Sequence, residues 1–204
     1  MMDRETESYW SHITGEALLG EMKGKHLKNM PAVHTTWSRW IADHPQTRVL
    51  KKDKTVSSSQ YENYFKDPDK VGIFRAEWLK ERLPAKKLVH GLTHGPHALA
   101  VTAEKLEKDH LIQTELDTGG VIVVKNTDGG VRAYSTNVDK TTLTFNIGDS
   151  PGVFKDAGTG SSWDLGRGEC TGGALKGKKL EELTVTAAFW FAWSGFYPNT
   201  AVID

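Results

Sequence analysis

The chain has 204 residues, of which 38% are hydrophobic, and it carries 26 basic and 26 acidic side chains. That length and composition suffice for a packed core. The zero formal net charge excludes a whole-chain field that would steer the protein to nucleic acid or to an anionic membrane. A single cysteine, Cys170, excludes an intramolecular disulfide and a thiolate metal site, and it leaves the redox compartment undetermined.

Residues 1–20 lack the basic segment, apolar run and cleavage site of a signal peptide. No stretch approaches the roughly 18 uninterrupted apolar residues of a membrane span. We therefore expect a soluble chain with no membrane span and no nucleic-acid partner, whose cellular compartment the sequence leaves open.

Residues 3–49 recur 153 positions further along the chain, as residues 156–202. We call residues related by this offset repeat twins. Average residue usage gives about three identities by chance over such a length, whereas the observed twins are far more numerous. The copy 1 residues whose twins are the same amino acid are Asp3, Thr6, Ser8, Trp10, Gly15, Glu16, Gly20, Lys23, Gly24, Lys25, Leu27, Trp37, Trp40, Pro45, Thr47 and Val49. We predict a single domain with an internal repeat: copy 1 over about 3–50, a middle β region over about 51–152, and copy 2 over about 153–204.

Each copy is predicted to run from short strands through glycine turns to a helix. Strands are expected at residues 7–14 and 161–165. The i, i+3 spacing of Trp37 and Trp40, repeated at Trp190 and Trp193, indicates a short helix with both rings on one face. Thr35 or Thr36 could cap the first helix and Thr186 the second, with strands following at residues 47–50 and 200–203. The paired tryptophans are interpreted as core anchors.

The middle region is predicted to be mostly β. Residues 86–102 indicate a hairpin that turns at Gly95 and Pro96, and residues 120–135 a hairpin that turns through residues 128–130. Strands follow at residues 141–147 and 152–156, with short helical pieces at residues 77–87 and 103–110. We therefore expect an α+β, mainly β fold, with two related units of antiparallel strands that each end in a short tryptophan-containing helix.

The two copies differ most where the helix begins, and a specialised site could lie there. His34, Thr35, Thr36, Ser38 and Arg39 correspond to alanines and phenylalanines in copy 2. The first helix can therefore face water or a ligand, while the second is apolar on nearly all sides and should be buried. We predict a ligand-binding face of His34, Thr36, Trp37 and Arg39. His34 could act as an acid, base or metal ligand, or could simply bond a neighbouring turn.

Three further histidines, His90, His94 and His97, cluster around the first predicted hairpin turn. They could bind Zn or Cu if their nitrogens converged to about 2 Å from the ion. No cysteine and no suitably spaced carboxylate completes the set, so a solvated turn is the alternative. Metal content and any other cofactor stay open.

Three stretches also resemble a known family: "DRETESYWSHITGEALLGEMKGKHL", "PAVHTTWSRW" with "HPQT", and "FWFAWSGFYPNT". The chain resembles the bacterial and archaeal family called domain of unknown function 3179, and it matches the C-terminal, two-repeat portion of typical members. The resemblance implies no settled activity. It also implies that relatives are longer, with an upstream half that includes a "CPLCGSA"-like segment, and that many of them are exported.

No set of nucleophile, base and oxyanion donor can be assembled from the sequence. The leading hypothesis is therefore a non-catalytic binding or structural module, and whether the chain is an enzyme stays open. One alternative is a metal-binding protein or metal-assisted enzyme that uses some of His34, His90, His94 and His97. Another is an oligomeric scaffold in which an open sheet edge pairs with a second copy.

Overall fold

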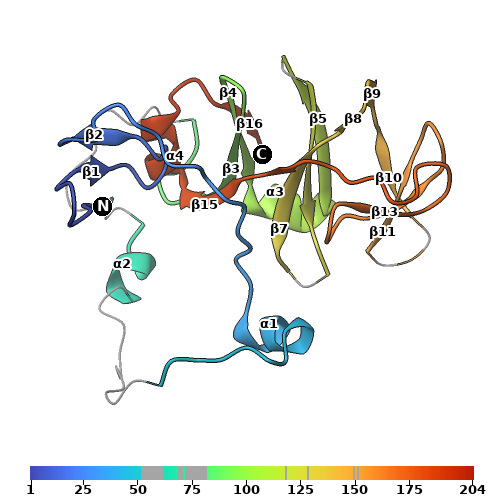
Figure 1. The fold of residues 1–204 in the computed structure, drawn as a ribbon, viewed down its shortest axis with the longest axis horizontal. Coiled ribbons are helices and arrows are strands. Elements are labelled where there is room, and N and C mark those ends of the chain that lie inside the picture. Colours follow the sequence, from blue (N-terminus) through green and yellow to red (C-terminus); the bar gives the residue numbers. More distant parts are fainter. Residues whose placement is uncertain are drawn as a thin grey trace.

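The fold was obtained as a computed structural model that describes residues 1–51, 62–68, 71, 82–117, 119–127, 129–148, 150 and 152–204. Short, mostly antiparallel sheets make up most of its regular secondary structure, which confirms the expected α+β, mainly β class. Figure 1 shows α4, the sheets of the middle region and the sheet of copy 2 arranged in successive layers. No helix within these ranges is long and apolar enough to cross a membrane.

Two four-stranded sheets form the middle layers. The first has the order β15-β3-β4-β16, with β3 and β4 forming the predicted hairpin and β16 parallel to β4. The second has the order β14-β7-β6-β5, and its β6–β7 hairpin was also predicted. Their bounds are β3 Leu88–His94, β4 His97–Thr102, β5 Leu111–Leu116, β6 Gly119–Lys125, β7 Val131–Ser135, β14 Glu182–Leu183, β15 Val185–Phe189 and β16 Ala201–Ile203.

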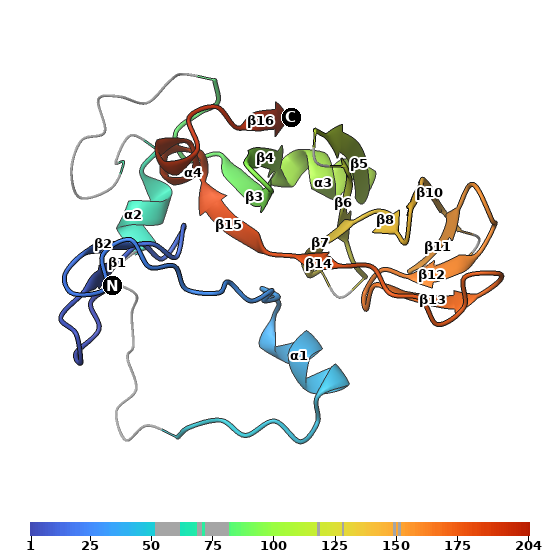
Figure 2. The same cartoon turned by 45° about the horizontal axis from the view of Figure 1, so that its top comes forward.

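The near-continuous apolar run of β6 reflects burial on both faces of its sheet. Because successive side chains of a strand point to opposite faces, Val121 and Val123 join a core with Leu92 of the first sheet. Ile122 and Val124 join the core on the other side of the second sheet. The second sheet is thus the central layer of the stack (Figure 2).

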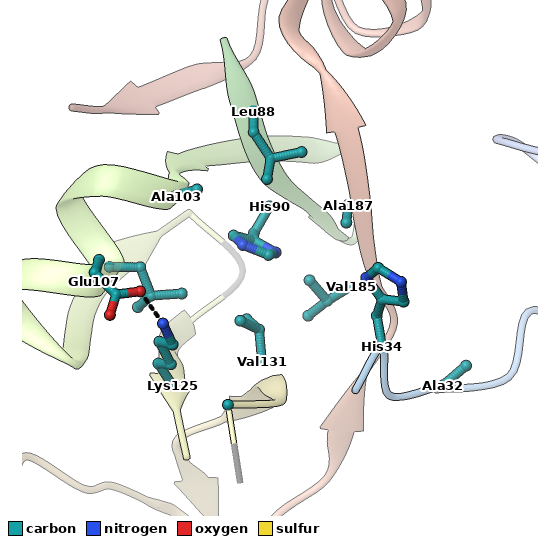
Figure 3. A pocket seen from close by; sticks show the side chains of 12 residues that line it. Ala32, His34, Leu88, His90, Ala103, Glu107, Lys125, Val131, Val185 and Ala187 are labelled. Atoms are coloured by element: carbon teal, nitrogen blue, oxygen red, sulfur yellow. Dashed lines mark hydrogen bonds and ion pairs between the residues drawn. The ribbon is translucent and has the colours of Figure 1, made fainter. Parts of the chain in front are cut away.

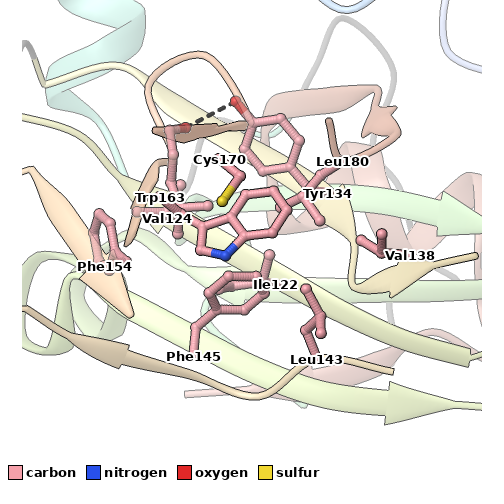
Figure 4. Close-up of a cluster of buried hydrophobic side chains, with 11 residues drawn as sticks. Ile122, Val124, Tyr134, Val138, Leu143, Phe145, Phe154, Trp163, Cys170 and Leu180 are labelled. Carbon is pink, nitrogen blue, oxygen red and sulfur yellow. Dashed lines mark hydrogen bonds between the residues drawn. The ribbon is translucent and has the colours of Figure 1, made fainter. Parts of the chain in front are cut away.

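A third sheet, of order β10-β11-β12-β13, covers the other face of the central layer. Trp163 is fully buried there and meets the ring of Phe145 edge-on, with centroids 5.6 Å apart. Tyr134 of the central sheet packs in the same cluster and donates its hydroxyl to the carbonyl of Leu165 at 2.8 Å (Figure 4). The strand bounds are β10 Phe145–Ile147, β11 Val153–Asp156, β12 Ser162–Asp164 and β13 Glu169–Gly172.

Short helices and small strand pairs complete the described fold. Helix α3 spans Ala103–Asp109, as predicted, and Thr102 caps it by accepting from the amide of Lys105. Helix α4 spans Trp190–Phe196 and packs on the outer face of the β3–β4 hairpin. The remaining elements are α1 Trp37–Asp43, α2 Glu62–Lys66, β1 Tyr9–Trp10, β2 Ala17–Leu19, β8 Asn137–Val138 and β9 Thr141–Thr142.

The repeat recurs in the local hydrogen bonds. Trp10 donates its indole N–H to Asp3 Oδ2 at 2.7 Å, and its twin Trp163 donates to Asp156 Oδ2 at 3.2 Å. Helices α1 and α4 begin and end at twin positions. The second tryptophan of each helix donates to a threonine hydroxyl, which lies at 2.9 Å in copy 1 and 3.1 Å in copy 2.

The surroundings of the two copies differ. Trp190 and Trp193 are 1% and 2% exposed, as expected of core anchors, but Trp37 and Trp40 are 54% and 39% exposed. The core-anchor prediction is therefore wrong for α1, which stands off from the layers in both overall views (Figures 1 and 2).

Some local predictions also fail, and one of them lies partly outside the described residues. Residues 47–50 form no strand, whereas their twins form β16 by pairing with β4. Thr186 lies within β15 and does not cap α4, because that strand continues to the residue before the helix. Of the helical piece predicted at residues 77–87, residues 77–81 lie outside the described residues, and residues 82–87 form turns and bends and no helix, so this part of the prediction is wrong.

Candidate functional site

The chain segment before α1 brings His34 to the middle sheets. His34 and His90 line one cavity of about 210 Å³, together with Ala187 (Figure 3). His90 lies on β3 opposite Ala187 of β15, and Ala187 is the repeat twin of His34. The small side chain of Ala187 leaves room beside His90, so the two twin positions form parts of the same cavity wall.

His90 is the most perturbed base in this cavity. Burial, the charge of Lys125 and the neighbouring His34 together lower the pKa of His90 to about 4. Its imidazole is therefore neutral at physiological pH, with one nitrogen that donates a hydrogen bond and one that accepts. Leu106, Val131 and Val185 give the same cavity apolar walls.

An ion pair lies on one side of the cavity. Lys125, at the end of β6, pairs with Glu107 of α3 (Figure 3). The Lys125 backbone amide also donates to the carbonyl of His110 at 2.8 Å, which fixes the end of the strand against the end of α3. Glu107 is the only carboxylate among the described residues that line this cavity, and it is already matched by a cation.

A second cavity of about 370 Å³ adjoins the first. The two share Glu107, Lys125 and Gly129 as lining residues, so we treat them as one groove, called the His34–His90 groove. Arg39 of α1 lies directly against Gly129, where a Cβ atom would come within 1.9 Å of Arg39 Nη1. Gly129 also has φ +76°, so the turn requires glycine for its backbone as well as for this close contact.

Asn126 lines the second cavity and has an unmatched donor. Its Nδ2 atom is buried and has no hydrogen-bond partner. Leaving a buried donor unsatisfied costs about 1 to 3 kcal/mol, so such a group is expected to meet water or a ligand. With Lys125 and Arg39 in the same groove, the polar lining is rich in donors.

The structure brings part of the predicted ligand-binding face to this groove. His34 lines the first cavity of the groove, and Arg39 lines the second. Thr36 and Trp37 do not appear among the lining residues. The Thr36 hydroxyl lies 3.2 Å from that of Ser38, and Trp37 is largely exposed.

The predicted metal residues are placed in two locations. His94 and His97 face each other across the β3–β4 hairpin at its turn, and His97 Nε2 lies 3.5 Å from Asp117 Oδ2. His90 lies further along β3, in the groove. Within the described ranges, no group of three or more His, Cys, Asp or Glu side chains is placed to hold a metal ion. The three-histidine site stays a prediction without a preassembled ligand set.

The sequence reasoning missed Glu107, Lys125 and Asn126. A usable signal was present for two of them, because Lys125 and Asn126 end an apolar strand at a glycine turn, where polar side chains reach the sheet edge. Glu107 gave no such signal, since a charged residue on a short helix is usually solvated.

Comparison with known proteins gives one match. A family model described as "Protein of unknown function (DUF3179)" matches residues 1–200. No curated protein and no solved structure matches the chain.

Proposed function

This chain belongs to the DUF3179 family of proteins of unknown function, and from the groove we propose that it is a non-catalytic binding module for a small organic acid. The observation that carries the proposal is the buried, unpartnered Nδ2 of Asn126, a residue that lines the groove together with Lys125 and Arg39. A carboxylate is the acceptor that such a set of donors matches best.

The ligand is expected to have a short apolar body. Val131 and Val185 line the first cavity, and Ile147 and Phe154 line the second. The two cavities together reach the range of about 300 to 1,000 Å³ that is typical of small-molecule sites, and such sites combine apolar walls with a few polar groups. Neutral His90 can orient a hydroxyl or a carboxyl oxygen without adding charge.

A binding role is favoured over catalysis by the side chains that line the groove. No serine or cysteine is among the described lining residues, and Thr127 is the only one with a hydroxyl. The described lining therefore contains no Ser–His or Cys–His pair of the kind that often performs covalent catalysis.

Isothermal titration calorimetry with butyrate as probe tests the proposal. Butyrate should bind with saturable heat, and its uncharged isostere butyramide should bind at least tenfold more weakly, because the groove is lined by two cations, Lys125 and Arg39, and by one carboxylate, Glu107, and so favours an anion. Asn126→Leu and His34→Ala should each weaken butyrate binding, while His12→Ala, on an exposed histidine outside the groove, should not. Equal affinity of butyrate and butyramide, or full binding by Asn126→Leu, contradicts the proposal.

A divalent metal is a second candidate ligand, favoured because His34 and His90 line one cavity and His90 is neutral there. Neutral imidazole is the form that binds Zn²⁺. Zinc titration followed by thermal unfolding distinguishes this candidate: His34→Ala and His90→Ala should abolish a zinc-induced rise in Tm. If His94→Ala and His97→Ala abolish it instead, the metal binds at the hairpin turn. If zinc leaves Tm unchanged in the wild-type chain, the metal candidate is wrong.

A further inference from the structure

Helix α1 directs its arginine to the groove and its indoles toward solvent. Arg39 lies against Gly129 and lines the second cavity. Because successive residues of an α-helix are about 100° apart, Arg39 projects from the side opposite Trp37. Trp37 and Trp40 are 54% and 39% exposed, and the Trp40 indole N–H donates to Thr47 Oγ1 at 2.9 Å, within the same segment. The side of α1 that carries Arg39 therefore faces the groove, and the apolar side does not.

The local sequence gives α1 little stability of its own. The helix has seven residues, and isolated helices shorter than about 12 residues are marginal in water. Thr36 at its start makes no capping hydrogen bond, and α1 has no acidic residue in its first turn and no basic residue in its last. Helix α3, of equal length, has all three supports, in Thr102, Glu104 and Lys108. The stability of α1 therefore depends on contacts outside the helix.

The segment that contains α1 runs along both cavities of the groove. Residues 27–36 form neither helix nor strand. Ala32 and His34 of this stretch line the first cavity (Figure 3), and Arg39 lines the second. We call residues 32–44 the strap. Its side chains supply part of the groove wall, while the rest of the wall belongs to the middle layers.

The opposite wall is held by strand pairing. Lys125 ends β6, which is paired on both sides, and its backbone amide donates to the carbonyl of His110 at 2.8 Å. A ligand can contact Lys125 and Asn126 whether or not α1 is seated, but it can contact Arg39 only when α1 is seated. A ligand shifts a conformational equilibrium by the difference in its affinity for the two states. Because an arginine binds a carboxylate through charge-assisted hydrogen bonds, an anion in the groove favours the seated helix.

We propose that the strap responds to the ligand of the groove: an organic acid bound between Lys125 and Arg39 seats α1 against the layers and stabilises its helix. This inference rests on the proposed binding function and adds a conformational response to it. Because such coupling is reciprocal, a stable α1 also tightens binding of the acid.

Hydrogen exchange of the full chain tests the first direction of the coupling. Saturating butyrate should slow amide exchange of residues 36–44 about tenfold, the shift expected of one hydrogen bond to a charged group. Exchange in the buried twin helix, residues 190–196, should stay as it is. Arg39→Gln should bind butyrate more weakly and lose most of the slowing at saturation. Arg48→Gln, on an exposed arginine of the same segment outside the groove lining, should keep it.

A substitution in α1 that lies outside the groove lining tests the reverse direction. Ala42 is exposed and is not among the residues that line either cavity. Ala42→Gly lowers the stability of the helix, so butyrate should bind two- to fivefold more weakly. The repeat twin of Ala42 is Gly195 of α4, and Gly195→Ala should leave the butyrate affinity unchanged.

The outcomes separate the strap from the binding site. If calorimetry shows that butyrate binds while residues 36–44 exchange as before, the strap proposal is wrong and the binding proposal stands. Wild-type affinity in Ala42→Gly, or full slowing in Arg39→Gln, likewise overturns the strap alone. If butyrate does not bind, the proposed function is contradicted, and the strap proposal fails with it.

Discussion

Gly91 lies directly beneath the indole of Trp193, so close that any side chain at position 91 would overlap the ring. Gly91→Ala should therefore displace Trp193 and lower the free energy of unfolding by about 2 to 3 kcal/mol. Gly195, in α4 itself, has no atom within 4 Å of a built Cβ. Gly195→Ala should leave stability unchanged or raise it by up to about 1 kcal/mol. Urea unfolding of both variants measures the difference, and equal effects would contradict this packing.

The repeat offers a second matched comparison in its tryptophans. Trp193→Ala should cost about 3 to 5 kcal/mol, because it removes a fully buried ring from the core under α4. Trp40→Ala at the twin position should cost less than about 1 kcal/mol, since that ring is 39% exposed. Chemical denaturation of the two variants gives the comparison, and a large loss for Trp40→Ala would mean that α1 is packed in solution.

The internal repeat made much of the local structure predictable. The paired tryptophans located α1 and α4, and the glycine turns located the two middle hairpins, because these signals depend on nearby residues. Which of these residues are buried was harder to predict. The spacing of Trp37 and Trp40 indicates a face of a helix, but it does not say whether a partner covers that face.

The groove was harder to predict for a related reason. His34 and His90 line one cavity because the chain segment before α1 lies beside the sheet that contains β3, and this approach joins distant parts of the chain. Comparing the two copies did single out His34 and Arg39, since their twins are alanines. It could not find Glu107 or Lys125, which lie in the middle region and have no twin.

The twin carboxylates Asp3 and Asp156 should make the stability of the chain fall at low pH. Hydrogen bonds from Trp10 and Thr6 lower the pKa of Asp3 to about 2, and at Asp156 burial opposes the shift but hydrogen bonds from Thr159 and Trp163 lower the pKa overall. A depressed carboxyl pKa contributes stability above its unfolded value near 4, and this contribution is lost as pH falls through the folded value. The free energy of unfolding should therefore fall more steeply with decreasing pH below about pH 4.

Replacing each carboxylate in turn distinguishes their contributions to stability. Asp156→Asn should destabilise the chain by about 2 kcal/mol at pH 7, because Asp156 is 1% exposed and accepts several hydrogen bonds. Asp3→Asn should have the smaller effect, because its site is partly open to solvent. Thermal unfolding at pH 7 ranks them, and the reverse order would contradict the difference in burial between the two copies.

His90 should give a second pH dependence, in a different window. Its folded pKa of about 4 lies below the ordinary value of 6.5, so the unfolded chain binds the proton more readily. Stability from neutral His90 is complete above about pH 6.5 and is lost as pH falls toward 4, by an amount on the order of 3 kcal/mol. His90→Gln should flatten the stability profile between pH 4 and 6.5, and His12→Gln should not. An unchanged profile in His90→Gln would show that His90 is solvated.

The proposed binding role is tested most directly by the side-chain amide signal of Asn126, because this residue lines the groove and its Nδ2 has no hydrogen-bond partner. In a nuclear magnetic resonance titration, butyrate should shift the Asn126 amide and the His90 ring signals along one saturating curve, while butyramide at the same concentrations leaves them in place. Shifts confined to exposed histidines such as His12, with Asn126 and His90 unmoved at saturating butyrate, would contradict an organic-acid site in the His34–His90 groove.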